Sequence, residues 1–354
     1  MNEKELRAIL QQIVPPDQSA RAAAQIRWNQ LAKPLGSLGL LEEQIMDLVA
    51  LTGDVNIQLQ KRALLVLCAD NGVVANSVTQ TDSSVTAAVA NALAAGESTV
   101  CHMAQVARCQ VVPVDMGIQD FPGVPGVLPR RVRNSTGDIA RVPAMNRGQC
   151  LSAIKIGMDL VLEQKQQGVS ILATGEMGIG NTTTSSAVAA VLLEQPPERV
   201  TGRGAGLSDD GLFRKQEIIR TAIALHQPNR EDPIGVLAAL GGLDLAGLCG
   251  VFLGGAIYRV PILIDGFISA VAALCAVMIH AGAAHAMFAS HVSAEPAGGL
   301  ILEALGKKPL ITAEMRLGEG SGAIAALPLL DMALAVYQSG QTFDHLGIPA
   351  YTAQ

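Results

Sequence analysis

The segment ATGEMGIGNTTTSSA, residues 173–187, stands between a short β-rich run at 169–173 and a helical pattern that extends to Leu193. Gly175, Gly178 and Gly180 allow a tight turn and expose backbone N–H groups, and a helix N-terminus adds positive dipole character. Hydroxyls at 182–184 can cap the helix or donate to an oxyanion. The pattern favours a phosphate-binding turn, with an ordinary strand-to-helix connection as the alternative. No lysine follows the glycines, so the segment is not a Walker A loop, and it is not a GxGxxG fingerprint either.

The same alternation of strand and helix continues on both sides of this segment. We expect strands at 64–68, 110–114, 261–264 and 287–290, and helices at 85–95 and 151–167. Apolar strands between helices predict a mainly parallel, doubly wound α/β sheet covered on both faces. Three of the strands end in Asp70-Asn71-Gly72, Asp115-Met116-Gly117 and Asp265-Gly266. Ligands bind beyond the carboxyl ends of such strands, so these residues suit a site rim, although they suit simple turns equally well.

Both ends of the chain have helical patterns instead. Residues 3–13 and 18–31 are helical in spacing, and KPLGSLGLLE at 33–42 turns and then resumes a helix. Near the other end, LGEGSG at 317–322 leads into an apolar helix that we expect Pro328 to interrupt. We predict a smaller helical domain made of residues 1–60 and 318–354, and a large α/β nucleotide-binding domain over 61–317.

Composition excludes several classes of protein. The 354 residues are 49% hydrophobic and 16% charged, with a net charge of −6 and no basic stripe, which argues against a nucleic-acid partner. The six cysteines form no CxxC pair and predict buried thiols in a reduced, cytoplasmic protein without a zinc site. The N-terminus does not resemble a signal peptide. Residues 267–289 lack charged side chains but are Ala-rich and include two histidines, so we expect a buried helix rather than a membrane span.

Three further segments carry candidate functional residues. In MRLGEGSGA at 315–323, Glu319 stands between glycines and is free to meet a ligand, while Arg316 can bind an anion or tune that carboxylate. A solvated Arg–Glu pair is the alternative. In residues 202–224 a glycine-rich loop precedes a helix bearing Lys215, which suits a phosphate or simply solvent.

The segment SHVSAEP, residues 290–296, places a serine beside a histidine. No G-x-S-x-G elbow surrounds them, and side chains adjacent in sequence rarely face each other, so a hydrolase triad is not predicted. The Ser293 hydroxyl is available to a phosphate group.

Taken in order along the chain, these segments resemble the nicotinate-nucleotide:dimethylbenzimidazole phosphoribosyltransferase family. The matching stretches are KPLGSLGLLE (33–42), the strand with Asp70-Asn71-Gly72, VDMGI (114–118), ATGEMGIGNTTTSSA (173–187), HQPN (226–229), GGLDLAGLCGVFLGGA (241–256), LIDGFISA (263–270), SHVSAE (290–295) and MRLGEGSGA (315–323). The likeness spans nearly the whole chain.

The resemblance implies transfer of ribose 5-phosphate from nicotinate mononucleotide to an aromatic lower-ligand base, giving an α-ribotide and nicotinate in cobamide assembly. It implies a doubly wound large domain, a small helical domain from both termini, and a dimer, formed with a second copy or with a paralogue, whose active site lies near the subunit interface. No cofactor or metal is expected, because no diphosphate leaves. Glu319 is expected to be the catalytic base. The expected substrate-binding residues are Glu176, Gly178, Gly180, Asn181, Thr182, Gly204, Lys215, Asp265, Ser293, Arg316 and Leu317.

Two departures from the family pattern bear on the acceptor. Asn71 stands where the family commonly has histidine, and Val89 stands where it commonly has glutamine, although Thr81 nearby still offers a hydroxyl. Losing an amide suits an acceptor with fewer polar atoms, so a phenol or cresol is an alternative to a benzimidazole. The departures also leave open a second hypothesis, a non-catalytic helper subunit of a heterodimeric transferase. The retained Glu319 and the intact 173–187 segment argue against it.

Overall fold

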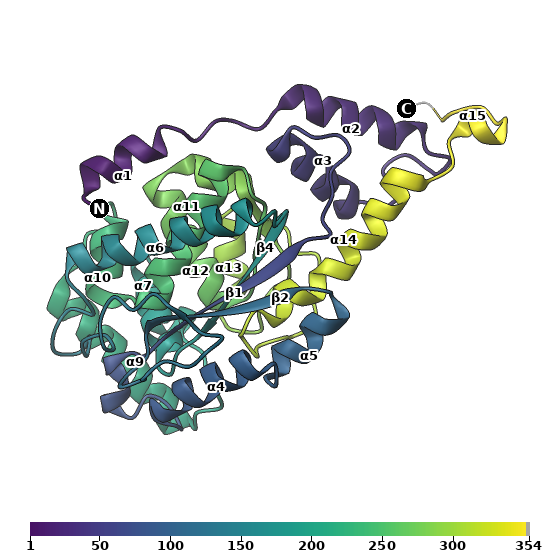
Figure 1. Cartoon of the computed structure of the whole chain (residues 1–354). Coiled ribbons are helices and arrows are strands. Elements are labelled where there is room, and N and C mark those ends of the chain that lie inside the picture. The colour runs from purple at the N-terminus through teal and green to yellow at the C-terminus, as the bar shows by residue number, and fades with distance from the viewer. Residues whose placement is uncertain (352–354) are drawn as a thin grey trace.

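A computed structural model describes residues 1–351 as a parallel sheet with helices on both faces (Figure 1). Every strand pair is parallel, in the order β3-β2-β1-β4-β5-β6. The strands are β1 (Arg62–Ala69), β2 (Gln110–Gly117), β3 (Leu128–Pro129), β4 (Ile171–Met177), β5 (Ile262–Ile264) and β6 (Met287–Ala289). The predicted doubly wound α/β architecture is confirmed.

Alternate residues of β1 enter two different hydrophobic cores. Leu65 and Leu67 belong to one core, whereas Leu64, Val66 and Cys68 belong to the other, as the two-residue period of a strand requires. The first core is closed by α1 (Glu3–Leu10), α6 (Arg147–Gln166), α7 (Asn181–Leu192), α8 (Pro197–Val200), α9 (Asp209–His226), α10 (Pro233–Leu240), α11 (Leu243–Tyr258), α12 (Phe267–Ile279) and α13 (Gly298–Ala304). The second is closed by α2 (Gln18–Gln30), α3 (Leu40–Thr52), α4 (Ser84–Ala95), α5 (Thr99–Val106) and α14 (Ser321–Ser339), and the short helix α15 (Phe343–Leu346) follows α14.

Glycines let α6 and α11 pack with their backbones almost in contact. A Cβ at Gly157 of α6 would lie 2.0 Å from the Gly247 carbonyl oxygen, and one at Gly250 of α11 would lie 2.0 Å from the Ile154 carbonyl oxygen. Side chains cannot be added at either position without moving a helix. The Ala- and Gly-rich composition therefore serves this close contact.

Helix α2, the end of α14 and α15 meet in an arm that projects from the body (Figure 1). The Ala32 amide donates to the Gln341 carbonyl oxygen at 2.8 Å, and the rings of Trp28 and Tyr337 lie 5.2 Å apart. These contacts join α2 to the end of α14. The division into domains at residues 60 and 318 stays a prediction, since α3 and α14 also pack in the core beneath the sheet.

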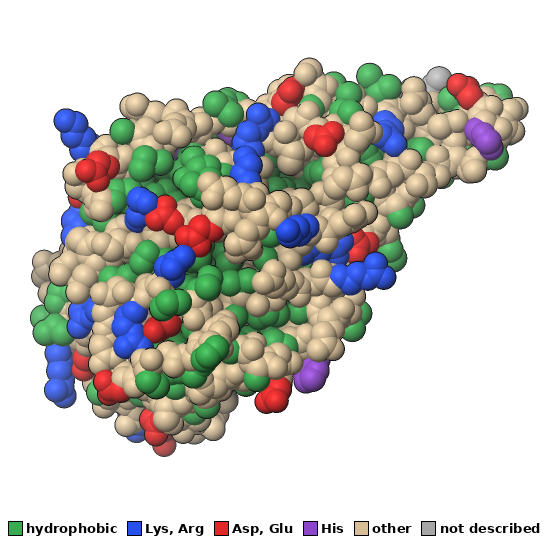
Figure 2. Space-filling view, in the orientation of Figure 1, with side chains coloured by type: hydrophobic (Ala, Val, Ile, Leu, Met, Phe, Trp, Pro, Cys, Tyr) green, Lys and Arg blue, Asp and Glu red, His purple; other side chains and the backbone are tan. Residues whose placement is uncertain are grey.

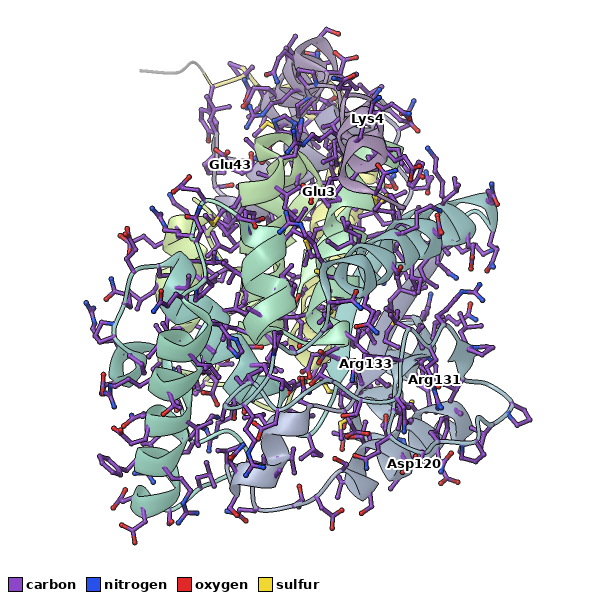
Figure 3. The ribbon with its side chains drawn as sticks, turned by 90° about the vertical axis from the view of Figure 1, so that its left-hand side faces the viewer. Glu3, Lys4, Glu43, Asp120, Arg131 and Arg133 are labelled. Atoms are coloured by element: carbon purple, nitrogen blue, oxygen red, sulfur yellow. The ribbon has the colours of Figure 1, made fainter. Side chains whose placement is uncertain are left out.

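Helix α1 is attached separately to the other side of the molecule. Arg147 at the start of α6 pairs with Glu3 of α1, which Figure 3 labels, and with both carboxylate oxygens of Asp232 at 2.6 and 2.9 Å. These half-exposed pairs position α1 rather than contribute much stability.

Three expectations about element boundaries were wrong. Helix α14 continues through Pro328, because its neighbours Leu327 and Leu330 are buried and their packing offsets the lost backbone hydrogen bond. Strand β4 runs to Met177 rather than ending at Ala173, so Glu176 lies in the strand. Residues 267–289 are α12, a short 3-10 helix (Ala281–Ala286) and strand β6 rather than one helix. A second 3-10 helix covers Gly72–Asn76.

Burial agrees with the compositional predictions. All six cysteines are buried and unpaired. Among residues 1–351 one helix, α14, is long and apolar enough to cross a membrane by those two criteria, and 56% of its apolar window is buried in the fold. On the face that Figure 2 shows, Lys and Arg side chains lie scattered among Asp and Glu without forming a basic region.

Replacing Gly250 with alanine should lower the free energy of unfolding by about 1–3 kcal/mol, because the added methyl group forces α6 and α11 apart. Gly299→Ala is the matched control, since a Cβ there meets nothing within 4 Å. Chemical denaturation of both variants measures the difference. Equal midpoints would show that the α6–α11 contact is not as tight as described.

Candidate active site

A cavity of about 250 Å³ opens beyond the carboxyl ends of β4, β5 and β6. It lies where the Asp-ended strands were expected to bind a ligand. Ten of the predicted site residues line it: Glu176, Gly178, Asn181, Thr182, Gly204, Asp265, Ser293, Arg316, Leu317 and Glu319. They come from separate segments of the chain, which the fold brings together around one cavity.

The Asp265 carboxylate, at the end of β5, binds the start of α14. Its oxygens accept hydrogen bonds from the amides of Gly320 at 3.2 Å, Gly322 at 2.7 Å and Ala323 at 3.0 Å. The residue before the helix is a glycine with no side chain for capping, so Asp265 acts as the cap from 55 residues away in sequence. Burial raises the pKa of Asp265, and His291 and the amides of Ala323 and Gly322 oppose that rise. The bonds fix the position of the segment immediately before α14.

Glu319 lies in that segment with a left-handed backbone. Its φ is 59°, and the flanking Gly318 and Gly320 have φ of 87° and 93°. A non-glycine residue is rare in this region and is often found at functional sites. A Cβ at Gly175 of β4 would lie 2.5 Å from the Glu319 carbonyl oxygen, so the close approach of strand and loop requires that glycine. The Glu319 carboxylate accepts a hydrogen bond of 3.4 Å from the Val100 amide in the first turn of α5.

Glu176 is the second carboxyl group of the cavity. The amide nitrogen of Asn181 donates to Glu176 Oε2 and, at 3.2 Å, to Asp244 Oδ2. Burial, with the nearby Asp244 and Asp265 carboxylates, raises the pKa of Glu176 to about 8. Glu176 therefore carries a proton at neutral pH and can donate a hydrogen bond.

Lys215 of α9 lies behind the cavity wall and does not line it. Its side chain is fully buried, and Nζ donates to Thr182 Oγ1 at 2.9 Å and to the Gly202 carbonyl oxygen at 3.1 Å. Burial lowers the pKa of Lys215 to about 8, and Glu295 opposes this. An ammonium group this well buried, hydrogen-bonded to a hydroxyl that does line the cavity, offers positive charge to a bound anion.

Four amides of the turn at 178–184 already have hydrogen-bond partners. The N–H groups of Asn181, Thr183 and Thr184 donate to carbonyl oxygens of Gly178 and Gly180, and that of Ile179 donates to Thr86 Oγ1 at 3.1 Å. The Thr182 hydroxyl, which lines the cavity, and the ammonium behind it are polar groups available here. Ser293, which is 9% exposed, and the exposed Arg316 also line the cavity.

Three predicted site residues lie elsewhere in the structure. Gly180 is part of the turn but does not line the cavity, and a Cβ there would lie 2.9 Å from Val74. Thr81 is exposed, and Val89 is half-buried on α4 against the second core. None of them lines this cavity. Asn71 is buried and donates to the Ile179 carbonyl oxygen at 3.3 Å, so it contacts the outside of the turn.

The cavity also contains residues that sequence reasoning missed. Met177, Phe267, Ile268 and His291 contribute lining, and Glu295 lies near Lys215. Asp244 lies behind Glu176 and is fully buried. The sequence feature that could have identified Asp244 is that it is the one acidic residue in the apolar run 241–256. Ser290 is buried and donates to the Ile264 carbonyl oxygen at 2.5 Å, and its Oγ also lies 3.2 Å from His291 Nδ1, so these two adjacent side chains do face each other, contrary to expectation.

Comparisons with known proteins agree with this geometry. A family model described as phosphoribosyltransferase matches residues 13–348. The nicotinate-nucleotide–dimethylbenzimidazole phosphoribosyltransferase of Acetivibrio thermocellus is 45% identical over 93% of this chain and 94% of its own length, and that of Clostridium acetobutylicum is 41% identical over 95% of each chain. The crystal structure of CobT from Thermus thermophilus superposes with a TM-score of 0.89 at 37% identity, covering 94% of this chain and 100% of its own. The chain therefore belongs to the nicotinate-nucleotide–dimethylbenzimidazole phosphoribosyltransferase family.

Proposed function

We propose that this chain transfers the ribose 5-phosphate of nicotinate mononucleotide to an aromatic base, releasing nicotinate and an α-ribotide for cobamide assembly. The names of its relatives support these substrates. The observation that carries the proposal is the cavity itself, in which two carboxyl groups, Glu176 and Glu319, share a space with Thr182 and the buried ammonium behind it.

The reaction explains why a carboxylate is needed and a metal is not. The departing ring is a pyridinium, which becomes neutral as its bond to C1′ breaks, so no acid is required. The acceptor must lose a proton as its nitrogen or oxygen attacks C1′. Glu319 accepts that proton, a step that supplies about 10²–10⁴-fold in rate. Attack from the face opposite the pyridinium inverts β to α, and holding both reactants in line supplies much of the remaining acceleration.

The two carboxyl groups take different roles because their surroundings differ. Glu176 is buried beside like charges and holds its proton, whereas Glu319 is half-buried with its carboxylate at the start of α5. Carboxyl groups in different surroundings can divide the roles of donor and base between them. Glu176 orients a substrate by donating a hydrogen bond, and Glu319 removes the proton.

The 5′-phosphate binds at the end of the cavity formed by Thr182, Gly204 and Ser293. Lys215 supplies the positive charge, since its Nζ donates to the Thr182 hydroxyl. Gly204 is close to the same ammonium group, because a Cβ there would lie 3.6 Å from Nζ. Arg316, at the open rim, is placed to pair with the carboxylate of nicotinate or with the phosphate. No cofactor is required for this chemistry.

The acceptor is an aromatic base, either a benzimidazole or a phenol. Val89, where the family commonly carries an amide, lies on α4 outside the cavity, so the phenolic alternative is supported by this difference in sequence and not by a contact in the cavity. Steady-state turnover with phenol, p-cresol and dimethylbenzimidazole ranks the three. A strong preference for dimethylbenzimidazole removes the phenolic alternative.

The arm provides a surface for a second subunit in a cytoplasmic dimer. Met332 and Val336 of α14 are 57% and 37% exposed, and Leu346, Ile348 and Tyr351 beyond it are about half exposed. Apolar side chains gathered on one arm are typical of protein interfaces. The partner is a second copy or a paralogue, and turnover by the purified chain alone excludes a purely helper role.

Glu319→Gln should reduce nicotinate release by the purified chain about 10²–10⁴-fold, because an amide cannot accept the acceptor's proton. Glu314→Gln is the matched control, since that residue is exposed on the same loop outside the cavity. Undiminished turnover by Glu319→Gln would remove the proposed base. Absence of turnover by the unmodified chain with every aromatic acceptor would favour the helper subunit.

Lys215→Met should raise KM for nicotinate mononucleotide about 10–100-fold, with a smaller change in kcat, because a charge-assisted contribution to phosphate binding is lost. In the unmodified chain KM should also rise as pH passes about 8, where the ammonium loses its charge, and this rise should be absent from the variant. Steady-state kinetics at several pH values measure both. An unchanged KM would place the phosphate elsewhere.

A further inference from the structure

We propose that Asp244 is a positioning residue for the transferase reaction, acting through the Asn181 amide to hold Glu176 in its orientation toward the cavity. The inference rests on the proposed function of Glu176 and extends it to a residue that does not line the cavity.

Asp244 is an unusual residue for its position. It stands in the first turn of α11, a helix whose other buried residues are all apolar or glycine. Its side chain is fully buried, and among residues 1–351 it forms no ion pair. Oδ1 has no hydrogen-bond partner there. Burying a carboxyl group without a cation costs stability, and packing alone would favour an apolar residue. A role in the site accounts for its presence.

The Asn181 amide connects Asp244 to Glu176. Its nitrogen donates to an oxygen of each carboxyl group, which uses both of its hydrogens. Turning the amide over would bring its oxygen against two carboxyl oxygens, so the pair of acceptors fixes its orientation. Glu176 Oε2 is thereby held, and Oε1 is directed beneath Gly318, where a Cβ would lie 2.8 Å from it. Oε1 thus lies beside the segment that carries Glu319.

Close packing prevents the Asp244 carboxyl group from turning away. A Cβ at Gly242 would lie 2.2 Å from Oδ1, and one at Gly178 would lie 3.2 Å from Oδ2. Both positions are glycine, which leaves room for the carboxyl group and little else. A Cβ at Gly178 would also lie 2.2 Å from the Ala69 carbonyl oxygen, so backbone atoms bound this side of the Asp244 carboxyl group.

The groups that face Glu176 make the coupling measurable. They are Asp244 from α11, Asp265 from the end of β5, Glu319 before α14, and the Asn181 amide from α7. After burial, the Asp244 charge is the largest cause that raises the pKa of Glu176, whereas the hydrogen bond from Asn181 lowers it. Removing Asp244's charge therefore lowers the pKa of Glu176, and removing the Asn181 amide raises it. Shifts of opposite sign would show that both groups act on the Glu176 carboxyl group.

The test compares Asp244→Asn and Asn181→Ala with the unmodified chain in pH profiles of kcat/KM for nicotinate mononucleotide. We expect the basic limb, near pH 8 in the unmodified chain, to move about 1 pH unit lower in Asp244→Asn and to move higher in Asn181→Ala. These profiles are recorded in the Lys215→Met background, because the Lys215 ammonium also loses its charge near pH 8. In that background the limb should be absent in Glu176→Gln and in the double variant Glu176→Gln/Asp244→Asn. The control is Asp115→Asn, a buried aspartate paired with Arg131 away from the cavity, which should leave the limb in place.

Loss of activity in Asp244→Asn at every pH with an unmoved limb would overturn the proposal, as would shifts of the same sign in both variants. A second readout needs no turnover: titration of the Glu176 carboxyl carbon by NMR, assigned by its absence in Glu176→Gln. If the unmodified chain does not release nicotinate, the proposed function fails, and this titration still decides whether Asp244 and Asn181 control Glu176. If Asp244→Asn does not fold, Asn181→Ala in the same titration decides the matter.

Discussion

The hydrogen bonds between the Asp265 carboxylate and the first amides of α14 are the interaction on which the site depends. They join the end of a central strand to a helix that begins 56 residues later, and the residue between glycines at this junction is Glu319. Without this cap the helix would begin with unsatisfied amides and no side chain to bind them. The carboxyl group that we propose as the base is thus positioned by a different carboxyl group, which is buried and does no chemistry itself.

Each glycine around this junction is required by a different steric contact rather than by a shared sequence motif. Gly175 allows the loop to touch β4, Gly318 leaves room above Glu176, and a Cβ on Gly320 would lie 2.3 Å from Leu64. The backbone of the loop therefore packs directly on the sheet, with left-handed conformations at three successive residues. Such an arrangement is rigid, and rigidity is what a site that holds two reactants in line requires.

The fold followed from the sequence far more completely than the site did. Apolar runs between helical segments predict a parallel sheet, since that pattern reflects burial on both faces, and strand positions came out within a few residues. The aspartate at residue 265 was expected at a rim, but its helix partner could not be read from local sequence because the contact is long-range. Likewise the full burial of Lys215 depends on α9 packing against α7. The prediction that Pro328 interrupts the helix was wrong because tertiary packing outweighs a local helix-breaking preference.

The central claim is that Glu319 faces the anomeric carbon of the bound nucleotide while the phosphate lies near Thr182 and Lys215. A crystal structure of this chain with nicotinate mononucleotide measures it most directly. The account predicts the phosphate against Thr182, with C1′ turned toward the Glu319 carboxylate across a gap that admits an aromatic acceptor. A nucleotide bound with C1′ directed away from Glu319, or with its phosphate outside this cavity, would contradict it.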